Sequence, residues 1–368
     1  MFGIVMSPYF FSKAYMMVMK HWRLPMSFLM STLLVIIGLS LRQSAHAVTP
    51  LYKVVERRVL PGNVQWDYLL ADGFAKRLYL SRGDYLEVLN LKSGALIGTV
   101  PGLGVHGVAL APELDRGFIS NGRDNTVTVF SLSSLKIVAK LPTGVNPDAI
   151  VYDPVSKRVF AANGKSGSIT AIDAVTDKVV GTTQIDGKLE FAVVNNKGKL
   201  FVNVEDHNQI AVVDTTSLNV LQRFDLGTAC NEPAGLSMDV IGNRLYAGCH
   251  NQKMVIVDAA TGTIVATPSI GRGSDATLYD AETNSAFSSN GEGSLTVISG
   301  KPPFAVEQVL QTMPGARTMA LDAVTHRIYL VSAESEQESD SLAPANKGAP
   351  TPRPKRKEGT FTLLTVGR

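Results

Sequence analysis

The chain has 368 residues, of which 45% are hydrophobic, 18% charged and 7% aromatic, with 32 Gly, 18 Pro and two Cys. This composition excludes a collagen, a low-complexity chain and a cysteine-rich miniprotein, and the length suffices for a large core. The formal charge of +3 originates in residues 1–47, which hold four basic and no acidic side chains. Subtracting these four from the 35 Lys and Arg leaves 31 against 32 Asp and Glu, a charge of −1. Bulk charge therefore gives no reason to expect nucleic acid or an anionic membrane as a partner.

The N-terminal residues have the order of a secretory signal peptide. Lys20 and Arg23 precede an apolar stretch over residues 26–41, and the small-residue pattern Ala45-His46-Ala47 follows. A single transmembrane anchor is the alternative, but the stretch is shorter than the roughly 20 residues that span a bilayer. We expect cleavage near Ala47, with residues 1–19 as an upstream extension of the signal peptide. The mature protein is then periplasmic or secreted, with no stable membrane anchor.

Beyond residue 50, short runs rich in Val, Ile, Leu, Thr, Tyr and Phe alternate with Gly, Asn and Asp turns, which is typical of an all-β chain. A basic residue before an apolar or aromatic run recurs every 39 to 45 residues, with a serine in one slot. A period near 42 with four short strands per unit predicts the blades of a β-propeller. The seven markers are Arg77, Arg116, Arg158, Lys199, Arg244, Ser285 and Arg327.

The third unit shows the expected layout of a blade, with strands over 149–152, 158–162, 168–174 and 178–183. An Asn-Gly pair after its second strand predicts a type I′ turn, and the pair recurs in two other blades. An Asp lies five residues before most markers, where its side chain is expected to cap a turn, so we interpret the Asp and Arg series as structural. These aspartates are Asp72, Asp153, Asp239, Asp280 and Asp322.

The last unit lacks a fourth strand, and the strand-like segment 54–60 at the other end of the domain can supply it. The prediction is an all-β, seven-bladed β-propeller with four-stranded antiparallel blades over residues 51–368, closed by the N-terminal strand completing the last blade. Residues 334–358 are acidic, then Pro-rich, then basic, and we expect a disordered loop within blade seven.

With the blades in place, the chain resembles the periplasmic YVTN-repeat (YncE-like) seven-bladed β-propeller family over about residues 51–368. The literal YVTN signature is absent, and Phe160-Ala161-Ala162-Asn163 is similar in place. One member of that family binds single-stranded DNA, which makes this activity a hypothesis here. Other segments that carry the resemblance are Trp66-Asp67-Tyr68, His106-Gly107-Val108-Ala109, Asn146-Pro147-Asp148-Ala149-Ile150, Val202-Asn203-Val204-Glu205-Asp206 and Phe287-Ser288-Ser289-Asn290-Gly291.

A candidate ligand site follows from the position ten residues before each marker (nine in blade four), where the innermost strand of each blade begins. Six of the seven residues there are ionisable, and they are expected to converge on one mouth of the central channel as a polar ligand site. A wet, polar channel mouth without a ligand is the alternative. We call this set the funnel ring: Asp67, His106, Asp148, Glu190, Ala234, Asp275 and Arg317.

A second set of residues is expected on the same face because the connections after the second strands lead there. The only two cysteines are expected to pair in an oxidising compartment, and the bridge would hold the loop of blade five beside the funnel. Free thiols or a soft-metal site are the alternatives. The second set comprises Trp66, Arg82, Asn121, Asn163, Glu205, His250 and Asn290, and the cysteines are Cys230 and Cys249.

These residues favour a binding or interaction module with a small polar ligand or a protein partner. An enzyme that uses the funnel ring with a metal or cofactor is the runner-up, and single-stranded DNA binding is the third hypothesis. No cofactor is predicted, because no G-x-G-x-x-G or P-loop opens a helix and the sequence contains no C-x-x-C-H or G-x-S-x-G motif. A carboxylate ring with one His would suit Ca²⁺ or a transition ion, but no local ligand motif identifies one.

Overall fold

The computed structural model describes residues 51–336 and 355–368. The expected signal peptide (1–47) and the greater part of the expected loop (334–358) lie outside the described residues. The described residues form one compact unit. Helical structure in the described part of this unit consists of three 3₁₀ turns, η2 (Pro112–Leu114), η3 (Glu205–His207) and η4 (Gly227–Ala229). None of these helices is long and apolar enough to cross a membrane.

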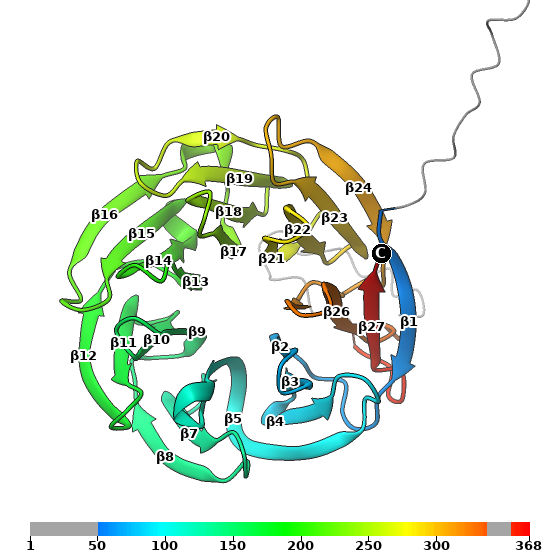
Figure 1. Cartoon of the computed structure of the whole chain (residues 1–368), viewed down its shortest axis with the longest axis horizontal. Helices are drawn as coiled ribbons and strands as arrows, with labels where there is room; N and C mark the ends of the chain where they lie inside the picture. Colours follow the sequence, from blue (N-terminus) through cyan, green and yellow to red (C-terminus); the bar gives the residue numbers. More distant parts are fainter. Residues whose placement is uncertain (1–50, 337–354) are drawn as a thin grey trace, which may run out of the picture. The chain divides into compact units, whose positions relative to one another are not determined.

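Short antiparallel sheets surround a central channel, with one strand of each sheet at the channel and another at the outer rim (Figure 1). The first four blades contain β2 (Leu69–Asp72), β3 (Arg77–Ser81), β4 (Gly83–Asn90), β5 (Leu96–Ala111), β6 (Arg116–Asn121), β7 (Thr126–Ser131), β8 (Ile137–Pro142), β9 (Pro147–Asp153), β10 (Arg158–Asn163), β11 (Ser168–Asp173), β12 (Lys178–Gln184), β13 (Leu189–Val194), β14 (Lys199–Val204), β15 (Gln209–Asp214) and β16 (Val220–Asp225).

The last three blades follow the same order from the channel outward. They contain β17 (Pro233–Asp239), β18 (Arg244–Cys249), β19 (Lys253–Asp258), β20 (Ile264–Ala266), β21 (Ser274–Asp280), β22 (Ser285–Asn290), β23 (Ser294–Ser299), β24 (Val306–Gln311), β25 (Met319–Asp322), β26 (Arg327–Ser332), β27 (Thr362–Gly367) and β1 (Lys53–Val59).

The N-terminal strand β1 pairs antiparallel with the C-terminal strand β27, as the missing fourth strand predicted. Blades one and two differ from the prediction, because β5 is one continuous strand shared by both. Residues 96–105 of β5 pair with β4, and residues 105–111 pair with β6, so the two blades form a seven-stranded sheet. Gly104, with a φ of 65°, lies where this strand changes partners.

The core is divided among the spaces between neighbouring blades. Among the described residues, seven buried apolar clusters occur, and each combines residues from two adjacent blades. One of them joins Leu80 of blade one to Tyr329 and Phe361 of blade seven. Each blade therefore buries both of its faces against its neighbours, which explains the short, nearly continuous apolar runs of the sequence.

The repeated basic markers and aspartates have structural roles, as predicted. Every marker is the first residue of the second strand of its blade. Arg77, Arg116 and Arg158 each bond to the turn between the third and fourth strands of the next blade. The repeated aspartates cap the turn between the first and second strands, for example Asp153, which accepts hydrogen bonds from the backbone of Val155 and Ser156.

The Asn-Gly turns were wrongly predicted as type I′. The positive φ that these connections need occurs later, at Asn125, Gly167 and Gly293, and not at the Asn-Gly pairs. The three asparagines are instead buried, and their amide groups donate to Ser or Thr hydroxyls on the third strand of the same blade. A buried amide needs such partners, and this requirement selects Asn at these positions.

Candidate functional site

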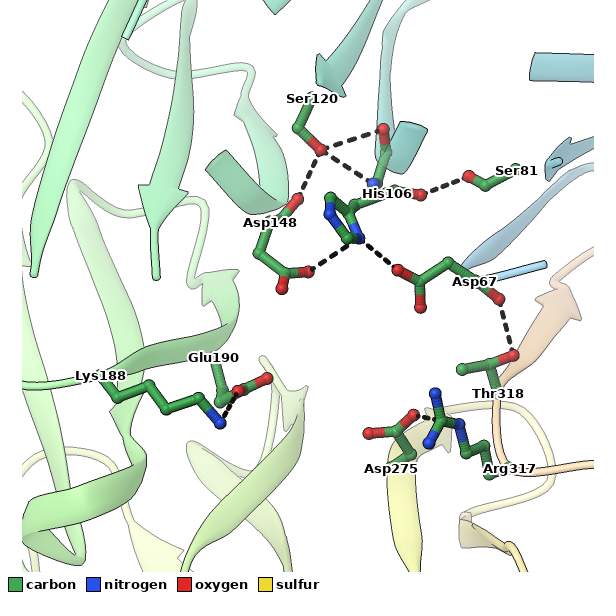
Figure 2. A network of polar contacts seen from close by, with 11 residues as sticks. Asp67, Ser81, His106, Ser120, Asp148, Lys188, Glu190, Asp275, Arg317 and Thr318 are labelled. Carbon is green, nitrogen blue, oxygen red and sulfur yellow. Dashed lines mark hydrogen bonds and ion pairs between the residues drawn. The ribbon is translucent and has the colours of Figure 1, made fainter. Parts of the chain in front are cut away.

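The funnel-ring residues lie where the innermost strands depart from regular pairing. In five blades the register of the inner strand shifts at this point, as in a β-bulge, and the ring residue lies within the shift. In blades one and seven the ring residue precedes β2 or β25. A bulge redirects side chains, and the six ionisable members of the ring point toward one another (Figure 2).

The backbone of the ring is held by side chains of adjacent blades. Hydroxyl or amide groups donate to the carbonyl oxygens of ring residues, for example Thr318 Oγ1 to Asp67 O at 2.7 Å. Because most of these bonds come from the second strand of the preceding blade, the position of each ring residue depends on the packing between blades. The other bonds run from Ser81 to His106, from Ser120 to Asp148, from Asn203 to Ala234 and from Ser289 to Arg317.

His106 lies between two carboxylates. Its Nδ1 contacts Asp67 Oδ2 directly and lies 3.9 Å from Asp148 Oδ1 (Figure 2). Burial disfavours the charged imidazolium, but the hydrogen bond to Asp67 and the charges of Asp148 and Asp67 outweigh it and raise the pKa of His106 to about 9. At neutral pH the imidazole is therefore protonated and joins the two acidic groups.

Two further carboxylates of the ring have cationic partners. Lys188 Nζ lies 2.8 Å from Glu190 and also bonds to Glu205, while Arg317 Nε lies 3.0 Å from Asp275. The ammonium group of Lys188 is thus shared between two carboxylates. Burial competes with its hydrogen bonds to Glu190 and Glu205, and the net effect raises the pKa of Lys188.

The acidic groups nevertheless exceed the cations around them. Burial, together with the charge of Asp67, raises the pKa of Asp148 to about 7. Burial and the charge of Asp148 likewise raise the pKa of Glu190 to about 8. The Oδ1 atom of Asp148 is buried and has no hydrogen-bond partner among the described residues. The funnel ring can therefore accept additional positive charge or protons.

Tyr68 and Phe191 lie one residue after ring positions in blades one and four. Their rings meet edge to face with centroids 5.3 Å apart. Burial, followed by the charges of Asp148, Asp67, Asp275 and Glu190, raises the pKa of Tyr68 well above its ordinary value. The phenol therefore stays protonated, and the pair lies across the channel next to the funnel ring.

A cavity of about 470 Å³ adjoins the ring between blades three and four. Asp148, Glu190 and Lys188 of the ring region line it, together with exposed polar residues such as Lys165 and Asp206. Its volume lies in the range of small-molecule sites, roughly 300 to 1,000 Å³. The ring and this cavity together form the candidate functional site.

The second predicted set divides into buried and open members. Asn121, Asn163 and Asn290 are fully buried within their blades, as described above, and do not reach the open face. Arg82 is also fully buried, where it forms an ion pair of 2.8 Å with Glu87 and lies 4.0 Å above the ring centroid of Phe361. These four side chains have structural roles, because their amide nitrogens or guanidinium group donate hydrogen bonds within the fold.

Of the other three members, Trp66 is half-buried, Glu205 is buried and His250 is exposed. Trp66 packs against Phe361, and the guanidinium of Arg356 lies over its ring at 5.2 Å. His250 Nδ1 lies 2.8 Å from Glu232 Oε2. Of these three residues, only Glu205 is bonded to the Lys188 ammonium at the ring.

Cys230 and Cys249 form a disulfide with a Cα–Cα distance of 5.3 Å, as the sequence predicted. The bridge ties the segment before β17 to the end of β18. Glu232 and His250, which flank the two cysteines, are thereby held within hydrogen-bonding distance. The bridge therefore orders the surface of blade five next to Glu205.

Two groups of described residues have donor atoms close enough to share a metal ion. In each group, one atom per residue lies within 4.8 Å of the others. In the first group the His106 imidazole already binds Asp67, and in the second Lys188 already binds Glu205. A metal would have to displace a proton or an ammonium group at these places. The groups are Asp67, His106 and Asp148, and Glu205, Glu232 and His250.

Three residues of the site were missed from the sequence: Lys188, Tyr68 and Phe191. A signal existed for the aromatic pair, because the residue after the ring position is small, namely Gly, Ala or Thr, in the other five blades. Two aromatic exceptions in one register indicate a special role in the channel. Lys188 lies in the loop before β13, where the repeat gives no register for a side chain.

The fold and the channel define this protein as a β-propeller. Solved structures with 7% and 8% sequence identity support the fold alone: U3-55K, with a TM-score of 0.69 over 85% of this chain and 99% of that one, and the RRP9 WD40 repeats, with 0.69 over 86% and 98%.

Residues 88–335, more than half of the chain, match the family model described as outer membrane protein assembly factor BamB, and the chain belongs to this β-propeller family. It is also YncE-like, as the sequence indicated. Two relatives named uncharacterized protein YncE, from Salmonella typhi and Salmonella typhimurium, are 24% identical over 210 residues. The matched region spans 54% of this chain and 58% of the length of each relative.

Proposed function

We propose that the protein is an exported binding module whose funnel ring binds a ligand that carries an ammonium or guanidinium group. The propeller fold and the family match support an interaction module. The matching family is described as an assembly factor for outer membrane proteins, which favours a protein partner. A lysine or arginine side chain of that partner is then the source of the cationic group.

The charge imbalance of the ring carries this proposal. Five carboxylates face three cationic side chains, and the buried Oδ1 of Asp148 accepts no hydrogen bond. An excess of buried charge of one sign is costly, and a ligand cation would offset the excess of carboxylates. The carboxylates are Asp67, Asp148, Glu190, Glu205 and Asp275, and the cations are His106, Lys188 and Arg317.

Calorimetric titration with the diamine putrescine tests this site, with succinate as the anionic control. We expect saturable binding of putrescine only, and a loss of about tenfold or more in affinity for Asp148→Asn. Glu307→Gln is the matched control, because Glu307 is exposed on the outer strand β24. Equal binding by Asp148→Asn, or a preference for succinate, would contradict the proposal.

Export is supported by the order of charged, apolar and small residues before residue 48 and by the Cys230–Cys249 disulfide, since such bonds persist in oxidising compartments. N-terminal sequencing of the protein recovered from its own cells tests this part. We expect a chain that begins at Val48 in the periplasmic fraction. A full-length chain confined to the cytoplasm would contradict it.

No observation favours the two alternative functions. Single-stranded DNA binding would use Arg82, Trp66 and Arg317, but Arg82 is engaged with Glu87, Trp66 with Arg356 and Phe361, and Arg317 with Asp275. Base stacking and phosphate binding require accessible aromatic and basic groups. The arrangement of the ring also selects no reacting group for an enzyme, so we do not propose catalysis.

A further inference from the structure

The channel contains a second cavity that differs from the funnel in its chemistry. This cavity of about 390 Å³ is lined by residues of the innermost strands of all seven blades. None of the described residues that line it is charged. Apolar side chains form most of its wall, including Leu70, Val151, Met238, Leu278 and Met319.

The aromatic pair separates this cavity from the funnel ring. Tyr68 and Phe191 line the cavity and lie in contact across the channel, just below the carboxylates. Asn196 and Val240, which belong to turns between first and second strands, also line it, so the cavity extends toward the face opposite the funnel. The channel therefore has a charged mouth and, beyond the aromatic pair, an uncharged compartment.

The polar groups in the wall are few and largely satisfied. Thr277 Oγ1 donates to Tyr246 O at 2.9 Å, and the Tyr279 hydroxyl donates to Asn284 at 2.7 Å. The Ser237 hydroxyl is buried in the wall without a hydrogen-bond partner among the described residues. Water in such a cavity finds few partners, so an apolar occupant is favoured over water.

We infer that this compartment is a binding site for a small, uncharged, hydrophobic molecule. The volume of this compartment fits a small molecule. Contacts with the apolar wall supply the affinity, because they remove the apolar surface of the ligand from water. The site is independent of the proposed cation site, because different residues line the two.

Fluorescence titration with the neutral probe N-phenyl-1-naphthylamine, on the mature chain at neutral pH, tests the inference. We expect one saturable site per chain, from which 1-decanol displaces the probe. Val151→Trp fills the cavity and should weaken binding at least tenfold, whereas Val309→Trp, on the exposed outer strand β24, should leave it unchanged. Asp148→Asn should also leave probe binding unchanged, which separates this site from the funnel.

Photolabelling of the unaltered protein with an uncharged alkyl diazirine gives a second readout that does not depend on the folding of a variant. Labels on Leu70, Met238 or Leu278 of the inner strands support the site. Labels spread over the outer strands, binding that does not saturate, or full affinity in a folded Val151→Trp variant would overturn it.

Discussion

Tyr68 and Phe191 belong to blades one and four, yet their rings lie edge to face with centroids 5.3 Å apart. Blades one and four are not neighbours, so this contact spans the channel. Above it lie the carboxylates that raise the pKa of Tyr68, and below it lies the uncharged cavity. This pair of side chains thus separates a charged compartment from an uncharged one.

The first prediction concerns the energy of this pair. Aromatic contacts of this geometry contribute roughly 0.5–1.5 kcal/mol beyond the burial of their area. A double-mutant cycle with Tyr68→Leu and Phe191→Leu, measured by urea unfolding, should give a coupling energy of about 1 kcal/mol. The stacked pair Tyr246 and Tyr279, with centroids 5.2 Å apart, is the control for an aromatic contact away from the channel mouth. A coupling energy near zero would show that the two rings do not contact each other in solution.

The fold could be predicted from the sequence because every blade needs the same types of residue at the same places, and these residues recur with the period of the blade. Each blade must place a basic residue at the start of its second strand and an Asp in the preceding turn, so these residues recur with the blade. The third blade was predicted almost to the residue: 158–162 was expected and β10 covers Arg158–Asn163. The continuous strand β5 could not be foreseen, because no residue type marks a strand that passes from one blade into the next.

The candidate site was only partly predictable. The ring register could be deduced because Asp67, His106 and Asp148 occupy the same place in successive repeats. Arg82 and Asn163 were misplaced, because the distance from a marker gives the position of a residue along the strand but not the face to which its side chain points. Contacts between distant blades, such as that of Tyr68 with Phe191, depend on the width of the channel, which the repeat does not encode.

The second prediction concerns the buried ion pair of Arg82 and Glu87. Arg82 is fully buried, and burial raises the pKa of Glu87 against the opposing charge of Arg82. Arg82→Met leaves the Glu87 carboxylate buried without a partner and should cost about 3–5 kcal/mol in the free energy of unfolding. The double variant Arg82→Met, Glu87→Leu should recover a large part of that loss. Chemical denaturation of the three proteins distinguishes this from a loss of packing alone, in which the double variant would be no more stable than the single one.

The third prediction concerns the Cys230–Cys249 disulfide. Its 19-residue separation gives about 3 kcal/mol of stabilisation on a chain-entropy estimate. A Cys230→Ala, Cys249→Ala variant should lose stability by about this amount, and reducing agent should lower the melting temperature of the unaltered protein but not that of the variant. An unchanged melting temperature under reducing conditions, with both thiols shown to be free by alkylation, would exclude a stabilising role for the bridge.

The fourth prediction is that stability falls as pH rises from about 5 to 9. The pKa values of Asp148 and Glu190 are raised above the ordinary carboxyl range, so the folded state binds more protons than the unfolded state between that range and pH 7 to 8. The pKa of His106 is raised from 6.5 to about 9, so its stabilising contribution is fully present below pH 6.5 and is lost as pH rises through 9. All three pKa values are raised, so in each case the folded state binds more protons than the unfolded state. Stability therefore decreases as pH rises through this range.

Thermal unfolding across this pH range measures the effect in the unaltered chain and in two variants. Asp148→Asn removes an ionisation that the folded state resists, so its melting temperature should depend less on pH below 8 and match or exceed that of the unaltered chain at pH 9. His106→Gln removes the bridging imidazolium, so it should be less stable at pH 6 and lose the decline between pH 6.5 and 9. Glu307→Gln, on the exposed outer strand, should keep the full pH dependence. A melting temperature that rises with pH in this window would show that the carboxylates of the funnel ring are not held close together.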